Sequence, residues 1–534
     1  MNIAAYTLFA QVYSMFSVYF PFDFSIGFPI LPYKKVTQNS FLYFSLWRVF
    51  DMHGVSLFPH PLFTLFLVFV FACAAGGCTK NKPDNTTLPD TAKTGSHRFL
   101  VLDPGHFHAG LVFKRSSYNG LSQQVGVYAP VGDDVIDFLN LTTPFNSRKD
   151  DPAQWSYRIY LGPDFMEAML REKSGDIVII SGKNNEKIDR IMASVQTGYS
   201  VLADKPWIIE PEKFALLDST LTLAERKGIP VYDIMTERFE ITTVLQRLIA
   251  GSEKVFGVLT PGTSEEPAVE KRSVHHLLKL VAGNPLKRPW WFFDTAIQGE
   301  GIVDVTTHLV DLVFWTLYPE QAIDYHKDIE MLSADRWPTM ITPEQFSRVT
   351  GKPQFPSQLK LDKNGGLPYY CNGSMSFRLK GTYIKVQVEW KFQAPEGAGD
   401  THYSVVKGTR TQVMIRQGME QKFIPELYVL PSPGIKPSEV KETLTAFIAS
   451  LAAKDYPGLA VVEEKGRFRI DIPAKYRVGH EAHFGQVTDR FLGFLDGKPM
   501  PSWERPNMLA KYFITTKALE LSRKKIEKAE GAQK

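Results

Sequence analysis

The chain has 534 residues, of which 44% are hydrophobic and 22% are charged, a composition that excludes disordered, fibrous and disulfide-rich proteins. Its 61 basic and 57 acidic residues give a net charge of +4, and this near balance gives no reason to expect a nucleic-acid partner. The length allows about two to four domains.

The first 78 residues differ in composition from the rest of the chain. They hold 14 of the 37 phenylalanines but only five Asp, Glu, Lys or Arg residues. The apolar run over residues 61–75 is as long as the hydrophobic part of a signal peptide and is short for a membrane span. Small residues separate it from Cys78, and this resembles a bacterial lipoprotein signal, in which the cysteine receives the lipid. We therefore predict a leader over residues 1–78 and a polar tether over residues 79–96.

Two features of this leader leave alternatives open. Cys73 is a second candidate for the lipidated residue, and the positive segment of a signal is missing unless Arg48 supplies it. Met52 is a candidate for the true start, with residues 1–51 an upstream mistranslation. A plain transmembrane anchor or a scrambled start would also explain the pattern. On the lipoprotein interpretation the protein lies at the bacterial cell envelope, on the periplasmic or outer-membrane face, and meets the membrane through its lipid alone. If the leader is an artefact, the protein is cytoplasmic.

The chain after the tether begins with a strand, a glycine turn and a helix. Residues 97–103 are rich in strand formers, Gly105 interrupts them, and residues 106–113 can start a helix. This is the first unit of a Rossmann fold, in which the glycine lets a pyrophosphate approach the backbone and the helix N-terminus attracts its charge. The G-x-G-x-x-G fingerprint is degenerate, because its first position holds Asp103 and its third holds His108. A tight turn without a ligand fits the same residues.

The following segments alternate between strand and helix. We predict strands over residues 125–129, 176–181, 200–203 and 229–233, and helices over residues 186–197 and 211–227. Such alternation with short connections predicts a parallel, doubly wound sheet, which binds ligands at the carboxyl ends of its strands. No acidic residue ends the strand at 125–129, so the pattern does not distinguish NAD from NADP.

The second half follows a different pattern. A helix over residues 242–250 and a strand over residues 254–259 lead into a loop-rich stretch. Alternating segments then predict an antiparallel sheet, with strands over residues 374–379, 383–392, 404–406, 411–416 and 428–430. Amphipathic helices are predicted over residues 439–453, 481–495 and 508–525.

One helical segment carries polar residues on a shared face. The apolar residues of 302–315 recur at helical spacing, and Asp304 and His308 are four positions apart, so their side chains can touch. Asp311 follows His308 by three positions.

Two motifs resemble those of the Gfo/Idh/MocA family, which includes glucose–fructose oxidoreductase and inositol dehydrogenase. The first, Asp204-Lys205-Pro206, follows a predicted strand and resembles the family's E-K-P signature. The second resembles the family's G-G-G-x-x-x-D-x-x-x-H-x-x-D segment and consists of Gly299, Gly301, Asp304, His308 and Asp311. Residues 501–504 also resemble the family's C-terminal end, so the resemblance spans about residues 97–525.

The resemblance implies an α/β protein with two domains. A Rossmann domain with a doubly wound parallel sheet would occupy residues 97–235. A C-terminal α+β domain with an open, mostly antiparallel sheet would occupy residues 236–534. Family members mostly oxidise or reduce sugars and polyols with NAD or NADP, and they commonly associate through the open sheet. A small-molecule carbohydrate substrate and a homo-oligomer are therefore expected.

The resemblance also implies roles for individual residues. His308 would be the base that takes a proton from the substrate hydroxyl, Asp304 would orient the substrate or the imidazole, and Lys205 would stabilise the developing alkoxide. The cofactor-binding residues would be Gly105, His106, Phe107, His108, Ser181, Gly182, Asn184, Asp204, Lys205 and Pro206. The candidate substrate-binding residues are His275, Arg288, Trp290, Trp291 and Asp311.

Other functions remain open at this point. The same scaffold could serve an NAD-dependent glycoside-cleaving enzyme, and the degenerate fingerprint would suit a non-catalytic carbohydrate-binding lipoprotein. The pair His106 and His108 has the residue type of a metal site, but two ligands are too few, so no metal is expected.

Overall fold

A computed structural model of the protein describes residues 96–281 and 284–531. The predicted leader, nearly all of the tether and the lipidation site at Cys78 lie outside the described residues. No helix within the described ranges combines the length and the apolar character that crossing a membrane requires.

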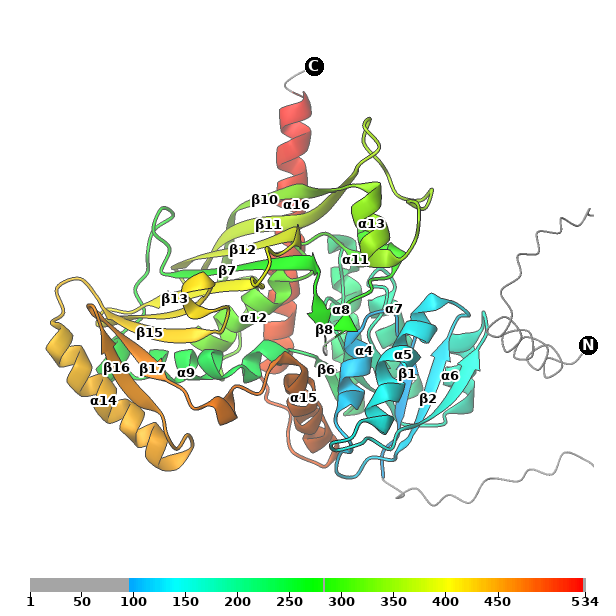
Figure 1. Ribbon diagram of the computed structural model, residues 1–534, viewed down its shortest axis with the longest axis horizontal. Coiled ribbons are helices and arrows are strands. Elements are labelled where there is room, and N and C mark those ends of the chain that lie inside the picture. The colour runs from blue at the N-terminus through cyan, green and yellow to red at the C-terminus, as the bar shows by residue number, and fades with distance from the viewer. Residues whose placement is uncertain (1–95, 282–283, 532–534) are drawn as a thin grey trace, which may run out of the picture. The chain divides into compact units, whose positions relative to one another are not determined.

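The N-terminal domain is the predicted Rossmann fold (Figure 1). Within the described residues its sheet has six parallel strands in the order β3-β2-β1-β4-β5-β6. They are β1 (Phe99–Leu102), β2 (Gln124–Ala129), β3 (Ser156–Leu161), β4 (Ile177–Ile180), β5 (Ser200–Ala203) and β6 (Val231–Asp233). The strand order changes direction between β1 and β4, and ligands of such sheets bind at this switch point.

The helices of this domain connect consecutive strands. They are α4 (His108–Leu111), α5 (Asp133–Ser147), α6 (Phe165–Glu172), α7 (Lys187–Thr197) and α8 (Phe214–Lys227). The helix predicted after Gly105 is short, because α4 has only four residues and continues as a 3-10 turn over Val112–Lys114. The first βα unit therefore lacks the long helix of a typical dinucleotide-binding unit.

A short helical region leads to the second domain. It contains a 3-10 turn over Thr236–Phe239, α9 (Ile241–Ala250) and α10 (Glu253–Phe256). The strand predicted over residues 254–259 is therefore wrong. Val255 and Phe256 are buried, as they would be in a strand. Their amides, however, donate to the carbonyl oxygen of Ser252, which closes a helical turn.

The second domain is built on a large, mostly antiparallel sheet, as predicted. Over the described ranges the sheet has nine strands in the order β10-β11-β12-β7-β13-β14-β15-β17-β16, and only the β7–β12 pair is parallel. The strands are β7 (Val269–Leu278), β10 (Ile329–Ile341), β11 (Leu367–Leu379), β12 (Thr382–Gln393), β13 (Thr401–Lys407), β14 (Thr411–Gln417), β15 (Glu426–Pro431), β16 (Ala460–Glu464) and β17 (Arg467–Asp471). Two short strands, β8 (Leu280–Val281) and β9 (Asn284–Pro285), form a separate hairpin.

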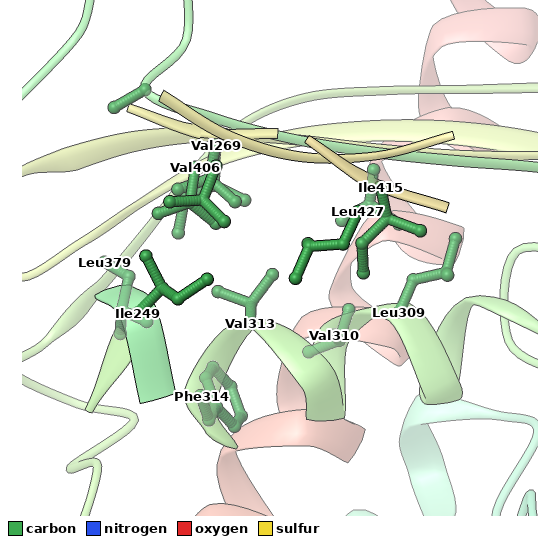
Figure 2. Close-up of a cluster of buried hydrophobic side chains, with 14 of the residues drawn as sticks. Ile249, Val269, Leu309, Val310, Val313, Phe314, Leu379, Val406, Ile415 and Leu427 are labelled. Carbon is green, nitrogen blue, oxygen red and sulfur yellow. The ribbon is translucent and has the colours of Figure 1, made fainter. Parts of the chain in front are cut away.

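Helices cover one face of the large sheet and form the main core with it. Figure 2 shows Val310 and Val313 of α12 (Thr306–Leu317) pointing toward Val269, Val406, Ile415 and Leu427 of the sheet. The remaining helices of the domain are α11 (Thr295–Gln298), α13 (Pro343–Thr350) and α14 (Pro437–Lys454). This packing fixes α12, and with it His308, against the sheet.

The last two helices return to the first domain. They are α15 (His480–Leu495) and α16 (Glu504–Gly531). Phe484 and Phe491 of α15 are buried in the core that contains β1 and β2, whereas Leu509 and Tyr512 of α16 are buried with α7 and α8 on the other face of the sheet. The end of the chain thus completes the Rossmann core and also helps to enclose the space between the domains.

Candidate active site

A cavity of about 1260 Å³ lies where the two domains meet. Both domains supply its walls, with residues from the loop after β1, the end of β5, α12, β7, β13 and α15. Its histidine content is high. Of the chain's 12 histidines, the described residues place seven on its walls, namely His106, His108, His275, His308, His402, His480 and His483.

The fold brings the loops after β1 and β5 together above the end of β4. The amide of His106 donates to the carbonyl oxygen of Ser181 over 3.0 Å, and the hydroxyl of Ser181 donates to Oδ2 of Asp204 over 3.3 Å. The Nδ1 atoms of His106 and His108 each lie 3.0 Å from the same oxygen of Asp204. All three side chains are largely buried.

Lys205 and Asp304 form a buried ion pair that links the domains. The ammonium of Lys205 donates to Oδ1 of Asp304, and the amide of Gln298 donates to Oδ2 over 3.1 Å. Burial alone would raise the pKa of Asp304, but the charge and hydrogen bond of Lys205, together with the hydrogen bond from Gln298 and the charge of His106, lower it overall. The pair therefore stands as ammonium and carboxylate, next to the cis peptide bond between Lys205 and Pro206.

His308 lies on the first turns of α12 and lines the same cavity. Burial, and then the charge of Lys205, lower its pKa well below the ordinary value, so the imidazole is neutral at pH 7. Its Nδ1 atom is buried and has no hydrogen-bond partner among the described residues. The expected contact with Asp304 does not form, because α12 begins at Thr306 and the Asp304 carboxylate, in the preceding turn, points to Lys205 and Gln298.

The predicted cofactor-binding residues fall into two groups. His106, Phe107, His108 and Lys205 line the cavity. The others do not line it: Gly105 is half-buried, and the buried ones are Ser181, Gly182, Asn184, Asp204 and Pro206.

The turn at Gly105 is covered by the second domain. A β-carbon on Gly105 would lie 2.6 Å from the indole ring of Trp291 and 2.9 Å from the carboxylate of Asp134. The indole N–H of Trp291 donates to this carboxylate over 2.9 Å. A pyrophosphate that crosses Gly105, as in a typical Rossmann site, would therefore have to displace Trp291.

Two of the predicted substrate-binding residues, His275 and Arg288, line the cavity. Nε of Arg288 donates to the carbonyl oxygen of Leu277 over 3.1 Å, and its guanidinium lies 4.3 Å from the ring centre of Phe292. One edge of the guanidinium is thus held by the backbone and its face by an aromatic ring.

The other three predicted substrate-binding residues lie elsewhere. Trp290 and Trp291 do not line the cavity. Asp311 forms a buried ion pair with Arg238, with atoms 2.7 Å apart, and a second one with Lys511 at 3.4 Å. Arg238 also pairs with Glu504 at 2.8 Å. This placement corrects the expectation for Asp311, which stabilises the contact between α12 and α16 and does not reach the cavity.

A second polar cluster forms around Asp400 and includes the predicted substrate-binding residue His275, which lines the same cavity. Asp400 accepts from Nδ1 of His276 over 2.9 Å and from Lys279 over 3.1 Å, and Nδ1 of His275 lies 3.3 Å from it. Despite burial, hydrogen bonding to His275 and the charge of Lys279 lower the pKa of Asp400. His275 and His276 lie on β7 and Lys279 directly follows it. The sequence pattern did not predict a strand there.

Comparisons with known proteins agree with this architecture. The family model described as "Putative oxidoreductase C terminal domain" matches residues 245–523. The crystal structure of a "putative oxidoreductase" from Parabacteroides merdae is 48% identical, with a TM-score of 0.78, and the match covers 81% of this chain and 98% of that one. A comparison with curated protein sequences gives no match.

More distant structures share the fold alone. An oxidoreductase structure from Thermotoga maritima has 13% identity and a TM-score of 0.51, over 80% of this chain and 98% of that one. A levoglucosan dehydrogenase in complex with NADH and L-sorbose has 12% identity and a TM-score of 0.50, over 80% of this chain and 97% of that one. With the domain match and the 48% identical relative, the chain belongs to the oxidoreductase family that carries this C-terminal domain.

Proposed function

We propose that the protein transfers hydride between NAD or NADP and a hydroxyl or keto carbon of a sugar or polyol. The observation that carries this proposal is the buried Lys205–Asp304 pair, which shares one cavity with the neutral His308. The levoglucosan dehydrogenase with the same fold was solved with NADH and L-sorbose, and this supports both the cofactor and the substrate class.

The residues of the cavity divide the chemistry between them. The low pKa of His308 keeps its imidazole in the form that accepts a proton, so it can take the proton of a substrate hydroxyl. Lys205 places positive charge beside the alkoxide that results. Asp304 holds the ammonium in position through the ion pair. Phe107 lines the cavity and would pack on the nicotinamide ring, which supplies or accepts the hydride when bound.

Other residues of the cavity supply groups that suit a carbohydrate. The guanidinium of Arg288 and the cluster around Asp400 can donate hydrogen bonds to several hydroxyl groups. Trp390 and Phe292 also line the cavity, and aromatic rings provide apolar area for a sugar ring.

The test uses the full chain with NAD or NADP and a panel of monosaccharides, polyols and glycosides. We expect formation of the reduced cofactor with at least one of them. Lys205→Met should lower kcat by about 100-fold or more, since it removes the charge that stabilises the alkoxide. The matched control is Lys213→Met, because Lys213 is exposed and pairs with Asp189 far from the cavity.

Equal kcat for the wild type and Lys205→Met would overturn the mechanism. Release of a leaving group from a glycoside, only when NAD is present, would instead identify the glycoside-cleaving activity on the same fold.

A further inference from the structure

The side chains of His106, His108 and Asp204 converge at one point beside the cavity. One ligand atom from each of the three lies within 4.8 Å of those of the other two. We propose that these residues bind a divalent transition-metal ion. Two imidazoles and a carboxylate are ligands that such ions prefer, and a three-residue site leaves coordination positions for water or substrate.

The two histidine–carboxylate distances are close to those between neighbouring ligands of a metal ion. Zinc bonds of roughly 2.0–2.2 Å in tetrahedral geometry place neighbouring ligand atoms about 3.3 Å apart. The Nδ1 atoms of His106 and His108 each lie 3.0 Å from Oδ2 of Asp204. An ion bound between each histidine and Asp204 would require that pair to separate by a few tenths of an ångström, and the ligand atoms of all three residues already lie within 4.8 Å of one another.

The burial of the Asp204 carboxylate favours a metal site over three residues that only share hydrogen bonds. The side chain is 2% exposed, and Oδ1 is buried without a partner among the described residues. A buried carboxylate is costly unless a cation pairs with it.

The cations nearest in sequence are engaged elsewhere. Lys205 pairs with Asp304, and the ammonium of Lys187 donates to the main-chain oxygen of Asp204 and not to its carboxylate. Over the described ranges, no lysine or arginine forms an ion pair with Asp204. A divalent ion bound between the three residues would supply a charge that pairs with this carboxylate.

The site is accessible from the cavity. His106 and His108 both line it, so an ion bound to them could exchange with solution and could contact a substrate oxygen. The sequence shows only the two histidines, because the third ligand lies on the loop after β5 and meets them only when β1 and β5 flank β4. With Asp204 the site has three protein ligands, where the sequence showed only two.

The experiment measures metal binding without a dinucleotide or a substrate, so its outcome does not depend on the proposed hydride transfer. The full chain is stripped with a chelator, dialysed and titrated with Zn²⁺ alone. We expect one Zn²⁺ per chain in the wild type. His106→Gln, His108→Gln and Asp204→Asn should each weaken Zn²⁺ binding by more than about 100-fold, beyond the loss seen when an outer-shell partner is removed. The control is His326→Gln, because His326 lies in the loop before β10, away from the cavity.

A second measurement does not rely on the variants folding. X-ray absorption of the wild type loaded with Zn²⁺ should show two imidazole ligands. The proposal is overturned if the wild type retains no Zn²⁺, if the three variants bind it as the wild type does, or if the absorption spectrum shows no imidazole ligand. Each of these results would leave the three residues as a hydrogen-bonded trio.

Discussion

At the scale of single residues, Lys271 is a buried lysine without a carboxylate partner. It lies on β7 with no exposed surface, and its ammonium donates to the hydroxyl of Ser404 over 2.8 Å and to the amide oxygen of Gln246 over 3.3 Å. Burial lowers its pKa from 10.5 to about 7. In the unfolded chain the ammonium of Lys271 keeps its proton up to about its ordinary pKa of 10.5. Between about pH 7 and pH 10 the unfolded state thus binds more protons, and stability rises with pH.

We therefore expect Lys271→Met to stabilise the protein near neutral pH. Since each pKa unit corresponds to about 1.4 kcal/mol, the free energy of unfolding at pH 7 should rise by roughly 1–4 kcal/mol. The gain should shrink as the pH approaches 10. No polar partner is left unpaired, because the hydroxyl of Ser404 also donates to Gln246 over 3.1 Å.

Denaturant unfolding at pH 7 and pH 10 measures this effect, with Lys391→Met, an exposed position on β12, as the control. The account would be contradicted if Lys271→Met lowered the free energy of unfolding at pH 7. It would also be contradicted if the stability of the variant had the pH dependence of the wild type, because the pKa of Lys271 would then not be lowered in the folded protein.

At the scale of elements, α15 belongs to the core of the first domain although it comes at the end of the chain. Phe491 has no exposed surface and is buried in the same cluster as Phe99 and Val127. We expect Phe491→Ala to lower the free energy of unfolding by about 3–5 kcal/mol, the cost of a large cavity in a packed core.

Thermal or denaturant unfolding would measure the loss from Phe491→Ala. The control is Val478→Ala, since Val478 is 49% exposed just before α15. A loss for Phe491→Ala no larger than that of the control would contradict the packing of α15 on the Rossmann sheet.

The elements that the sequence predicted well are those with a simple apolar pattern. Residues 176–181 and 200–203 contain continuous apolar runs, and both are confirmed as fully buried central strands, β4 and β5. β7 was missed because its buried face carries Lys271 and Ser273 among the apolar residues, so no alternation was visible. α5 was missed because Pro144 interrupts the helical pattern.

The site could be predicted only where a motif was contiguous. Lys205, Asp304 and His308 were found from their motifs and do line one cavity. The grouping of Asp204 with His106 and His108 depends on the order of strands in the sheet, which no local pattern encodes.

At the scale of the whole molecule, side chains of the second domain bind three aspartates at the start of α5 in the first domain. Lys287 pairs with Asp137 at 3.3 Å, Lys352 with Asp133 at 2.6 Å, and the indole of Trp291 binds Asp134. Of these residues, Trp291 and Asp134 cover the Gly105 turn that a dinucleotide would otherwise cross. The lipid at Cys78, the envelope location and a homo-oligomer stay predictions.

This cover predicts an effect of Trp291 on cofactor affinity. If the pyrophosphate crosses Gly105, Trp291→Ala removes the need to displace the indole, and the affinity for NAD or NADP should rise about tenfold, or ~1.4 kcal/mol. Calorimetric titration measures it, with Trp290→Ala as the control, since Trp290 is the more exposed neighbour. Equal affinities in the two variants would place the cofactor away from the turn.

Calorimetric titration of the wild-type full chain with NAD and with NADP tests the central claim most directly. The claim is that this cavity serves a nicotinamide-dependent oxidoreductase. We predict that at least one of the two binds with one dinucleotide per chain, and that a sugar or polyol then yields the reduced or oxidised cofactor. Absence of binding by both dinucleotides would contradict the claim and would favour a carbohydrate-binding protein that has kept the fold without the chemistry.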